Sequence, residues 1–181
     1  MACLLCLGFW QLGHGAYIPA KAWLAQELMQ RAWLRSANSR AQETPWPWAD
    51  TWPVARLSAM AGKVELIVLA GGSGRTLAFG PGHLSASVLP GEIGNSVIAG
   101  HRDTHFRFLR DVKVGESLYV ENIGGGKYRY EITGIDVVDS RHGSLLLDTD
   151  EAVLSLVTCY PFEQREAGGP LRYVVTAKMR Y

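Results

Sequence analysis

The chain has 181 residues, of which 48% are apolar and 19% are charged, a composition that excludes a disordered polypeptide. Its 18 basic and 17 acidic side chains leave a net charge of +1, so we expect no bulk attraction to nucleic acid. The three cysteines, Cys3, Cys6 and Cys159, are too few and too unevenly spread for a disulfide scaffold. All six tryptophans fall within the first 52 residues, which predicts two physically different parts of the chain.

The first of these parts opens with an apolar stretch. Residues 1–20 carry no Asp, Glu, Lys or Arg, but Gln11 and the segment 13–15 interrupt the roughly 20 apolar residues that a spanning helix needs. We expect residues 1–35 to associate with a membrane, through a weak signal anchor or the remaining part of a longer one. The alternatives are a secretory h-region and an apolar helix folded onto the body of the protein.

A helix is predicted over residues 21–35, because Pro19 suits a first-turn position and no breaker follows it. Its tryptophans, Trp23 and Trp33, fit either a bilayer interface or packing against the second part of the chain. The Thr-Pro-Trp-Pro-Trp run that follows cannot be helical, because each proline forces its predecessor towards extended geometry. We therefore divide the chain into an N-terminal segment, a stiff linker and a second domain, at residues 1–44, 45–53 and 54–181.

The second domain carries strand signals bounded by Gly, Pro, Asn and Asp. The clearest lies at 127–132, where Tyr128, Tyr130 and Ile132 alternate with charged residues, a period of two that indicates one buried and one wet face. We predict an all-β domain of roughly eight strands, and closure into a barrel would remove exposed edges. The segments with strand signals are 63–70, 83–89, 96–99, 117–123, 127–138, 152–158 and 171–179.

Two residues that could serve in nucleophilic catalysis lie just after predicted strands. Cys159 follows the strand 152–158, so we expect its side chain at a rim of the domain rather than in its core. His101 likewise leaves the buried strand 96–99, and a nearby imidazole or cation is what turns a thiol into an effective nucleophile. Taken singly, each residue has a plain alternative, an inert buried cysteine or a structural histidine.

Arg172 lies on the otherwise apolar final strand. A guanidinium in such a setting must find an anion or an acceptor, or reach water. The sequence leaves two partners open. One is a carboxylate such as that of Asp103 or Glu163, and the other is a developing oxyanion.

Three segments together resemble the signatures of sortases, the cysteine transpeptidases that attach proteins to cell envelopes. They are Ser-Leu-Val-Thr-Cys at 155–159, Gly-His-Arg at 100–102 and Leu-Arg-Tyr at 171–173. The order His, Cys, Arg and the spacings match over residues 54–181, with Ser155 where the family usually has Thr. The Trp-rich front segment and linker are similar to those of the Gram-negative branch, class GN.

The resemblance implies an eight-stranded β-barrel with an N-terminal helical segment. In it, Cys159 would attack a carbonyl of a C-terminal sorting signal of the Leu-Pro-any-Thr-Gly kind and form a thioester, which an amine then resolves. His101 would protonate the leaving amine and deprotonate the incoming one, and Arg172 would bind the substrate and its oxyanion. The expected substrate contacts are Ser155, Thr158 and Tyr160.

The implied partners are a protein that bears the sorting signal and an amine acceptor, and we expect no metal and no cofactor. The implied location is the periplasmic face of an inner membrane. Two alternatives remain at this point. One is a hydrolytic cysteine peptidase whose thioester is resolved by water, and the other is a non-catalytic β-barrel binding module in which Cys159 is inert.

Overall fold

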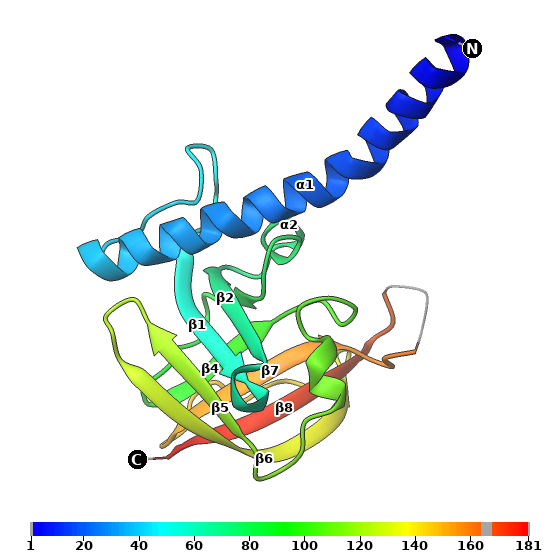
Figure 1. The fold of residues 1–181 in the computed structure, drawn as a ribbon. Coiled ribbons are helices and arrows are strands. Elements are labelled where there is room, and N and C mark those ends of the chain that lie inside the picture. Colours follow the sequence, from blue (N-terminus) through cyan, green and yellow to red (C-terminus); the bar gives the residue numbers. More distant parts are fainter. Residues whose placement is uncertain (1, 164–167, 181) are drawn as a thin grey trace.

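A long helix leads into a closed β-barrel in the computed structural model of the chain (Figure 1). The structure describes residues 2–163 and 168–180, with side chains described from residue 20 onward. The helix is α1 (Ala2–Ser39), and three short helical turns, η1 (Met60–Gly62), α2 (Gly74–Leu77) and η2 (Arg107–Arg110), lie in later loops of the described chain. The eight strands are β1 (Pro53–Ala59), β2 (Val64–Ala70), β3 (Gly82–His83), β4 (Gly94–Ala99), β5 (Ser117–Asn122), β6 (Lys127–Asp139), β7 (Ala152–Cys159) and β8 (Leu171–Arg180).

The strand order around the barrel is β1-β2-β3-β4-β7-β8-β6-β5, and pairing of β5 with β1 closes it. This confirms the predicted all-β, eight-stranded barrel. β7 lies between β4, which runs parallel to it, and β8, which runs antiparallel. The interior is filled by apolar side chains from all parts of the barrel, and the largest fully buried ones include Leu57, Ile98, Phe106, Tyr130 and Leu156.

Two strand predictions need correction. β1 was missed, although Ala55, Leu57 and Ala59 are buried in strict alternation with half-buried neighbours. The predicted strand 83–89 shrinks to its first residue in β3. The chain turns there because the Ser87 hydroxyl donates to a backbone carbonyl three residues earlier and accepts from the backbone of β4.

Helix α1 is longer than predicted, because it continues through Pro19 instead of beginning there. A proline removes one hydrogen bond from a helix, and here the turns on both sides persist. Among the described residues, no helix combines the length and the apolar character that crossing a membrane requires. The side chains of residues 1–19 lie outside the described part, so the predicted attachment and the predicted domain boundaries stay predictions.

The second half of α1 packs against the barrel beside β1 and β2 (Figure 1). Met29 and Trp33 are buried there, and the guanidinium of Arg56 lies over the Trp33 ring, 5.2 Å from its centroid. The Gln26 side chain donates to the carbonyl of Phe79 at 2.9 Å. Trp33 therefore packs on the second part of the chain, one of the two alternatives left open by the sequence.

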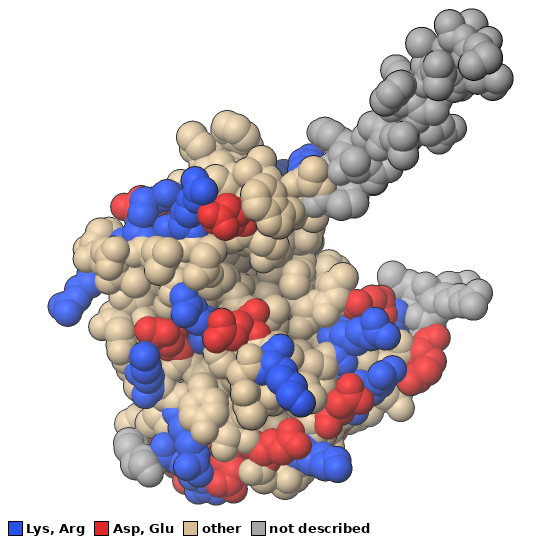
Figure 2. Space-filling model, in the orientation of Figure 1, with Lys and Arg blue, Asp and Glu red and all other residues tan. Residues whose placement is uncertain are grey.

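The molecular surface reflects the balanced charge. On the face shown in Figure 2, basic and acidic side chains alternate over the barrel and over the docked half of the helix, with tan, uncharged areas between them. Most of the described ion pairs join exposed side chains, such as Arg31 with Glu27 and Arg75 with Asp50. Such pairs contribute little to stability, so the apolar interior is the main source of stability for the barrel.

Candidate active site

Cys159 and Arg172 are direct partners across the β7–β8 ladder. Opposed residues of an antiparallel pair share one face of the sheet, with Cα atoms about 4.5–5.5 Å apart. The pairing extends one step beyond them, because the Tyr160 amide donates to the Leu171 carbonyl at 3.1 Å. Cys159 carries a free, half-buried thiol. The thiol and the guanidinium therefore begin from the same face at the same end of the barrel.

His101 reaches this end from the other neighbouring strand. β4 and β7 run parallel, with Ala99 opposite Val157, and the amide of Gly100 still donates to the Val157 carbonyl at 3.1 Å. His101 and Cys159 each lie two residues beyond that paired position, and neighbouring strands are about 4.8 Å apart. The imidazole is exposed. The predicted trio thus comes from the ends of three adjacent strands at one rim of the barrel.

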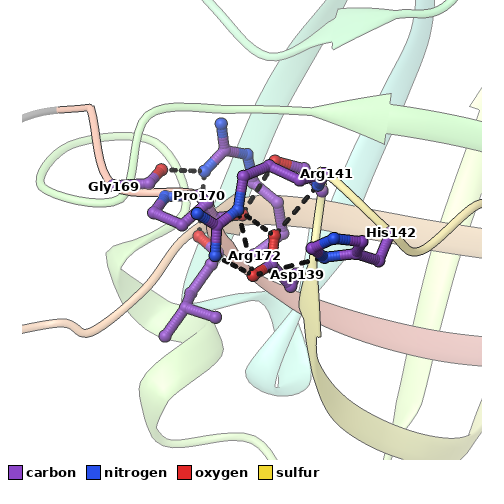
Figure 3. Close-up of polar contacts among 8 residues, drawn as sticks. Asp139, Arg141, His142, Gly169, Pro170 and Arg172 are labelled. Carbon is purple, nitrogen blue, oxygen red and sulfur yellow. Dashed lines mark hydrogen bonds and ion pairs between the residues drawn. The ribbon is translucent and has the colours of Figure 1, made fainter.

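The guanidinium of Arg172 is bound to carbonyl groups of its own chain segment (Figure 3). Its Nη1 donates to the Gly169 carbonyl at 2.6 Å and to the Leu171 carbonyl at 2.9 Å. The carboxylate of Asp139 is drawn beside it but pairs with Arg141, with Nη2 and Oδ2 2.6 Å apart. That pairing lowers the pKa of Asp139 to about 2.

The two acids predicted as alternative partners of Arg172 are engaged elsewhere or exposed. Asp103 binds Arg102 through both of its carboxylate oxygens, and Glu163 is exposed. Among the described residues, no carboxylate forms an ion pair with Arg172. The described hydrogen-bond partners of its guanidinium are instead the carbonyls of Gly169 and Leu171.

Sequence reasoning did not single out Arg102, which follows His101 and binds the segment after Cys159. Its side chain is only 5% exposed. Nε and Nη2 bind the two oxygens of Asp103 at 2.8 and 3.0 Å, and Nη1 donates to the carbonyl of Pro161 at 2.6 Å. The Asp103 hydrogen bonds raise the pKa of Arg102, burial opposes the rise, and the charges of Asp103 and Cys159 add to it. The signal in the sequence was an Arg-Asp pair directly after His101.

The three predicted substrate contacts differ in access. Ser155 and Thr158 are buried, and the Thr158 hydroxyl donates to the carbonyl of Gly100 at 2.7 Å. Tyr160 is half-buried and stacks on Tyr173, with ring centroids 6.0 Å apart and an interplanar angle of 14°. The two rings are neighbours of the Cys159–Arg172 pair in sequence and belong to the alternate positions of the β7–β8 pairing. Nothing in this geometry tests substrate binding, so the three contacts stay predictions.

His105 lies close enough to His101 for their charges to interact. Burial lowers the pKa of His105, and the charge of His101 lowers it further. Both effects favour the neutral form of the His105 ring. In the described part of the chain, no three side chains of His, Cys, Asp or Glu gather as metal ligands, and the arrangement at the rim has the composition of a thiol–imidazole–guanidinium site.

Comparison with known proteins gives a consistent family. A model of the sortase domain matches residues 57–180. Sortase D of Bacillus subtilis (strain 168) is 35% identical over 115 residues, which make up 63% of this chain and 57% of that protein. The structure of Sortase A from Corynebacterium diphtheriae is similar with a TM-score of 0.65 at 30% identity, covering 74% of this chain and 63% of that one.

A Clostridium perfringens Sortase D5 transpeptidase reaches a TM-score of 0.70 over 87% of this chain and 99% of that one. At 22% identity it supports the fold alone. This chain spans less than two thirds of the length of the first two relatives, the Bacillus and Corynebacterium proteins. The family match covers nearly all of the barrel, from β1 to the end of β8.

Proposed function

Because this chain belongs to the sortase family, we propose that it is a cysteine transpeptidase that cleaves a C-terminal sorting signal and transfers the acyl part to an amine. The observation that carries the proposal is the direct pairing of Cys159 with Arg172. The nucleophile and the cation that would serve the oxyanion thereby share one rigid ladder. His101, two residues beyond the paired part of β4, supplies the acid and base.

The proposed reaction has two acyl transfers. The Cys159 sulfur forms a bond to a backbone carbonyl carbon of the signal, the peptide C–N bond breaks, and the leaving amine takes a proton from His101. A second amine then gives a proton to His101 and attacks the thioester carbon, and the thiolate leaves. One peptide bond breaks and one amide bond forms, so no oxidant, reductant or cofactor enters the balance.

Arg172 would donate hydrogen bonds to the oxyanion of both tetrahedral intermediates. Its described hydrogen bonds, to Gly169 and Leu171, both come from Nη1. The Nε and Nη2 donors of the planar guanidinium therefore remain for the substrate. Because no described carboxylate neutralises the group, its charge would act on the developing negative oxygen in a partly buried setting.

The finer assignments belong to the same proposal. Tyr160 is the predicted substrate contact that a peptide reaches most readily, while the burial of Ser155 and Thr158 favours a supporting role beneath the site. We propose a signal of the Leu-Pro-any-Thr-Gly kind, membership of the Gram-negative class GN branch, and a location at the periplasmic face of the inner membrane. Exposed indole rings at Trp23 and Trp48 support a membrane-surface setting.

The test uses the protein, peptides of the form Leu-Pro-x-Thr-Gly with a reporter on each side, and triglycine as the amine. We expect a triglycine conjugate in the mass spectrum with the wild-type protein and none with Cys159→Ala. A product that forms equally without triglycine indicates hydrolysis by water instead. If a peptidyl vinyl sulfone leaves Cys159 unlabelled in the folded protein, the enzyme assignment is wrong.

A further inference from the structure

We propose that Arg102 is a positioning residue, which fixes the turn carrying His101 against the chain segment that leaves Cys159. The inference rests on the proposed function and deepens it, because it names what holds the acid–base group and the nucleophile in register. Arg102 belongs to the turn after β4, and its hydrogen-bond partner Pro161 belongs to the segment after β7. These two segments are 59 residues apart in sequence.

A first hydrogen bond joins the two segments just before His101 and Cys159. The buried hydroxyl of Thr158 donates to the carbonyl of Gly100 at 2.7 Å, one residue before both His101 and Cys159. This bond ties Gly100 to β7 one residue beyond Ala99–Val157, the last pair of the β4–β7 ladder. That ladder therefore ends before it reaches the imidazole and the thiol, although Cys159 itself is still paired with β8.

Arg102 provides the second tie, on the far side of the pair. Its Nη1 donates to the Pro161 carbonyl at 2.6 Å. Arg102 comes one residue after His101, and Pro161 comes two residues after Cys159. The two reacting groups are thus enclosed between one cross-link before them and one after them. Reacting atoms displaced by about 1 Å can cost 10²-fold in rate, so a tie at this position affects turnover directly.

The guanidinium suits this position because its donors point in several directions at once. Nε and Nη2 form a fork on both oxygens of Asp103, while Nη1 reaches across to Pro161. A lysine ammonium can keep the charge but has no planar fork to orient it. Asp103 is the counter-ion that makes burial of the cation tolerable, since an unpaired buried charge is costly.

The matched control is the second Arg-Asp neighbour pair of the chain. Arg110 and Asp111 are also consecutive, but both are about half exposed, and Nε and Oδ1 lie 3.5 Å apart. Arg110→Gln removes the same charge and the same number of atoms as Arg102→Gln without touching the site. We compare Arg102→Gln, Arg102→Lys and Arg110→Gln with wild type in the transpeptidation assay.

For Arg102→Gln we expect kcat to fall about 10²-fold while KM changes less than threefold, because positioning affects the reacting atoms more than substrate binding. Arg102→Lys should recover part of the loss, and Arg110→Gln should match wild type. Circular dichroism and the urea midpoint of each variant establish that it is folded in the assay. If folded Arg102→Gln keeps wild-type kcat, or if KM carries the whole effect, the proposal is overturned.

Two further measurements keep the test decisive. Should Arg102→Gln fail to fold, Asp103→Asn replaces it, with an expected fall in kcat of about tenfold at unchanged KM.

The rate of Cys159 alkylation by iodoacetamide at pH 7 needs no peptide substrate. We expect it to change at least threefold in Arg102→Gln and to stay constant in Arg110→Gln, because only the first substitution removes the hydrogen bond that holds the segment leaving Cys159. Equal alkylation rates would contradict the role of Arg102, whereas absent transpeptidation by wild type would contradict the proposed function alone.

Discussion

Cys159 and Arg172 face each other as a directly opposed pair, at the last position of β7 and the second position of β8. The two strands continue to pair for seven positions in total, so the backbone beneath these side chains belongs to the most regular part of the barrel. The Cα atoms that carry the sulfur and the guanidinium are thus held in place by the paired backbone. The pairing of their backbones does not depend on a loop conformation, and a fixed backbone is what preorganised oxyanion stabilisation requires.

The first prediction concerns the geometry of the Arg172 side chain. Arg172→Lys keeps the charge but removes the planar fork, so we expect kcat/KM for transpeptidation to fall about 10²-fold, in the range reported for loss of one oxyanion donor. Arg172→Gln, which loses the charge too, should be worse. The assay measures the triglycine conjugate by mass spectrometry under initial-rate conditions.

A neighbouring arginine serves as control for this prediction. Arg141 lies in the same corner but is bound to Asp139 and exposed (Figure 3), so Arg141→Lys should leave kcat/KM within about twofold of wild type. If Arg172→Lys is as active as Arg141→Lys, the guanidinium of Arg172 has no part in stabilising the oxyanion.

The second prediction concerns the buried hydroxyl of Thr158. Thr158→Val removes the donor to the Gly100 carbonyl with little change in volume and leaves that carbonyl without its side-chain partner. We expect the free energy of unfolding to decrease by about 1–3 kcal/mol. The measurement is urea denaturation followed by far-UV circular dichroism.

Thr133→Val is the matched control for this loss. The Thr133 hydroxyl donates to the Thr176 carbonyl at 3.3 Å on the exposed surface, where water replaces the donor. Its free energy of unfolding should change by less than about 0.5 kcal/mol. Similar losses in the two variants would mean that the β4–β7 tie contributes nothing beyond an ordinary surface hydrogen bond.

The convergence of His101, Cys159 and Arg172 was predictable because each residue sits at the end or the start of a strand. Strand ends are visible in the sequence as an apolar run that stops, and the order of the three signatures identified the family. Arg102 was not predictable in the same way. Its burial depends on a carbonyl 59 residues away, and a long-range hydrogen bond to a backbone atom leaves no mark on residue type.

The barrel was predictable in outline, and its errors have physical causes. β1 was overlooked because its inward positions include Ala55 and Ala59, whose small side chains give a weak alternation signal, and because Pro53 was assigned to the linker. The segment 83–89 was overpredicted because apolar residues alternate there, while the hydroxyl of Ser87 instead caps a turn. Local pattern cannot decide between a strand and a turn when a side-chain hydrogen bond sets the outcome.

The third prediction concerns stability in acid. Pairing with Arg141 lowers the pKa of Asp139 to about 2, below its ordinary value of 3.8. A carboxyl group whose pKa is lower in the folded state stabilises the fold above its unfolded pKa, and this contribution is lost as pH falls from about 4 to about 2. The Asp139→Asn variant should therefore lose less stability than wild type across that window.

The measurement for this prediction is the urea midpoint at pH 5, 3.5 and 2.5. Asp136→Asn, on the exposed part of the same strand, is the control and should follow wild type at each pH. A midpoint that declines equally in Asp139→Asn and in wild type would show that the Arg141 pair does not contribute to acid sensitivity.

The last prediction distinguishes the two tryptophans of α1. Trp33 is 2% exposed and lies under the guanidinium of Arg56, whereas Trp23 is 69% exposed. Trp33→Ala opens a cavity between the helix and the barrel, so we expect the free energy of unfolding to fall by about 3 kcal/mol, while Trp23→Ala should change it by less than about 0.5 kcal/mol. Urea denaturation monitored by circular dichroism gives both values. Because the two substitutions remove the same side chain from one helix, equal effects would mean that docking of α1 does not contribute to the stability of the barrel.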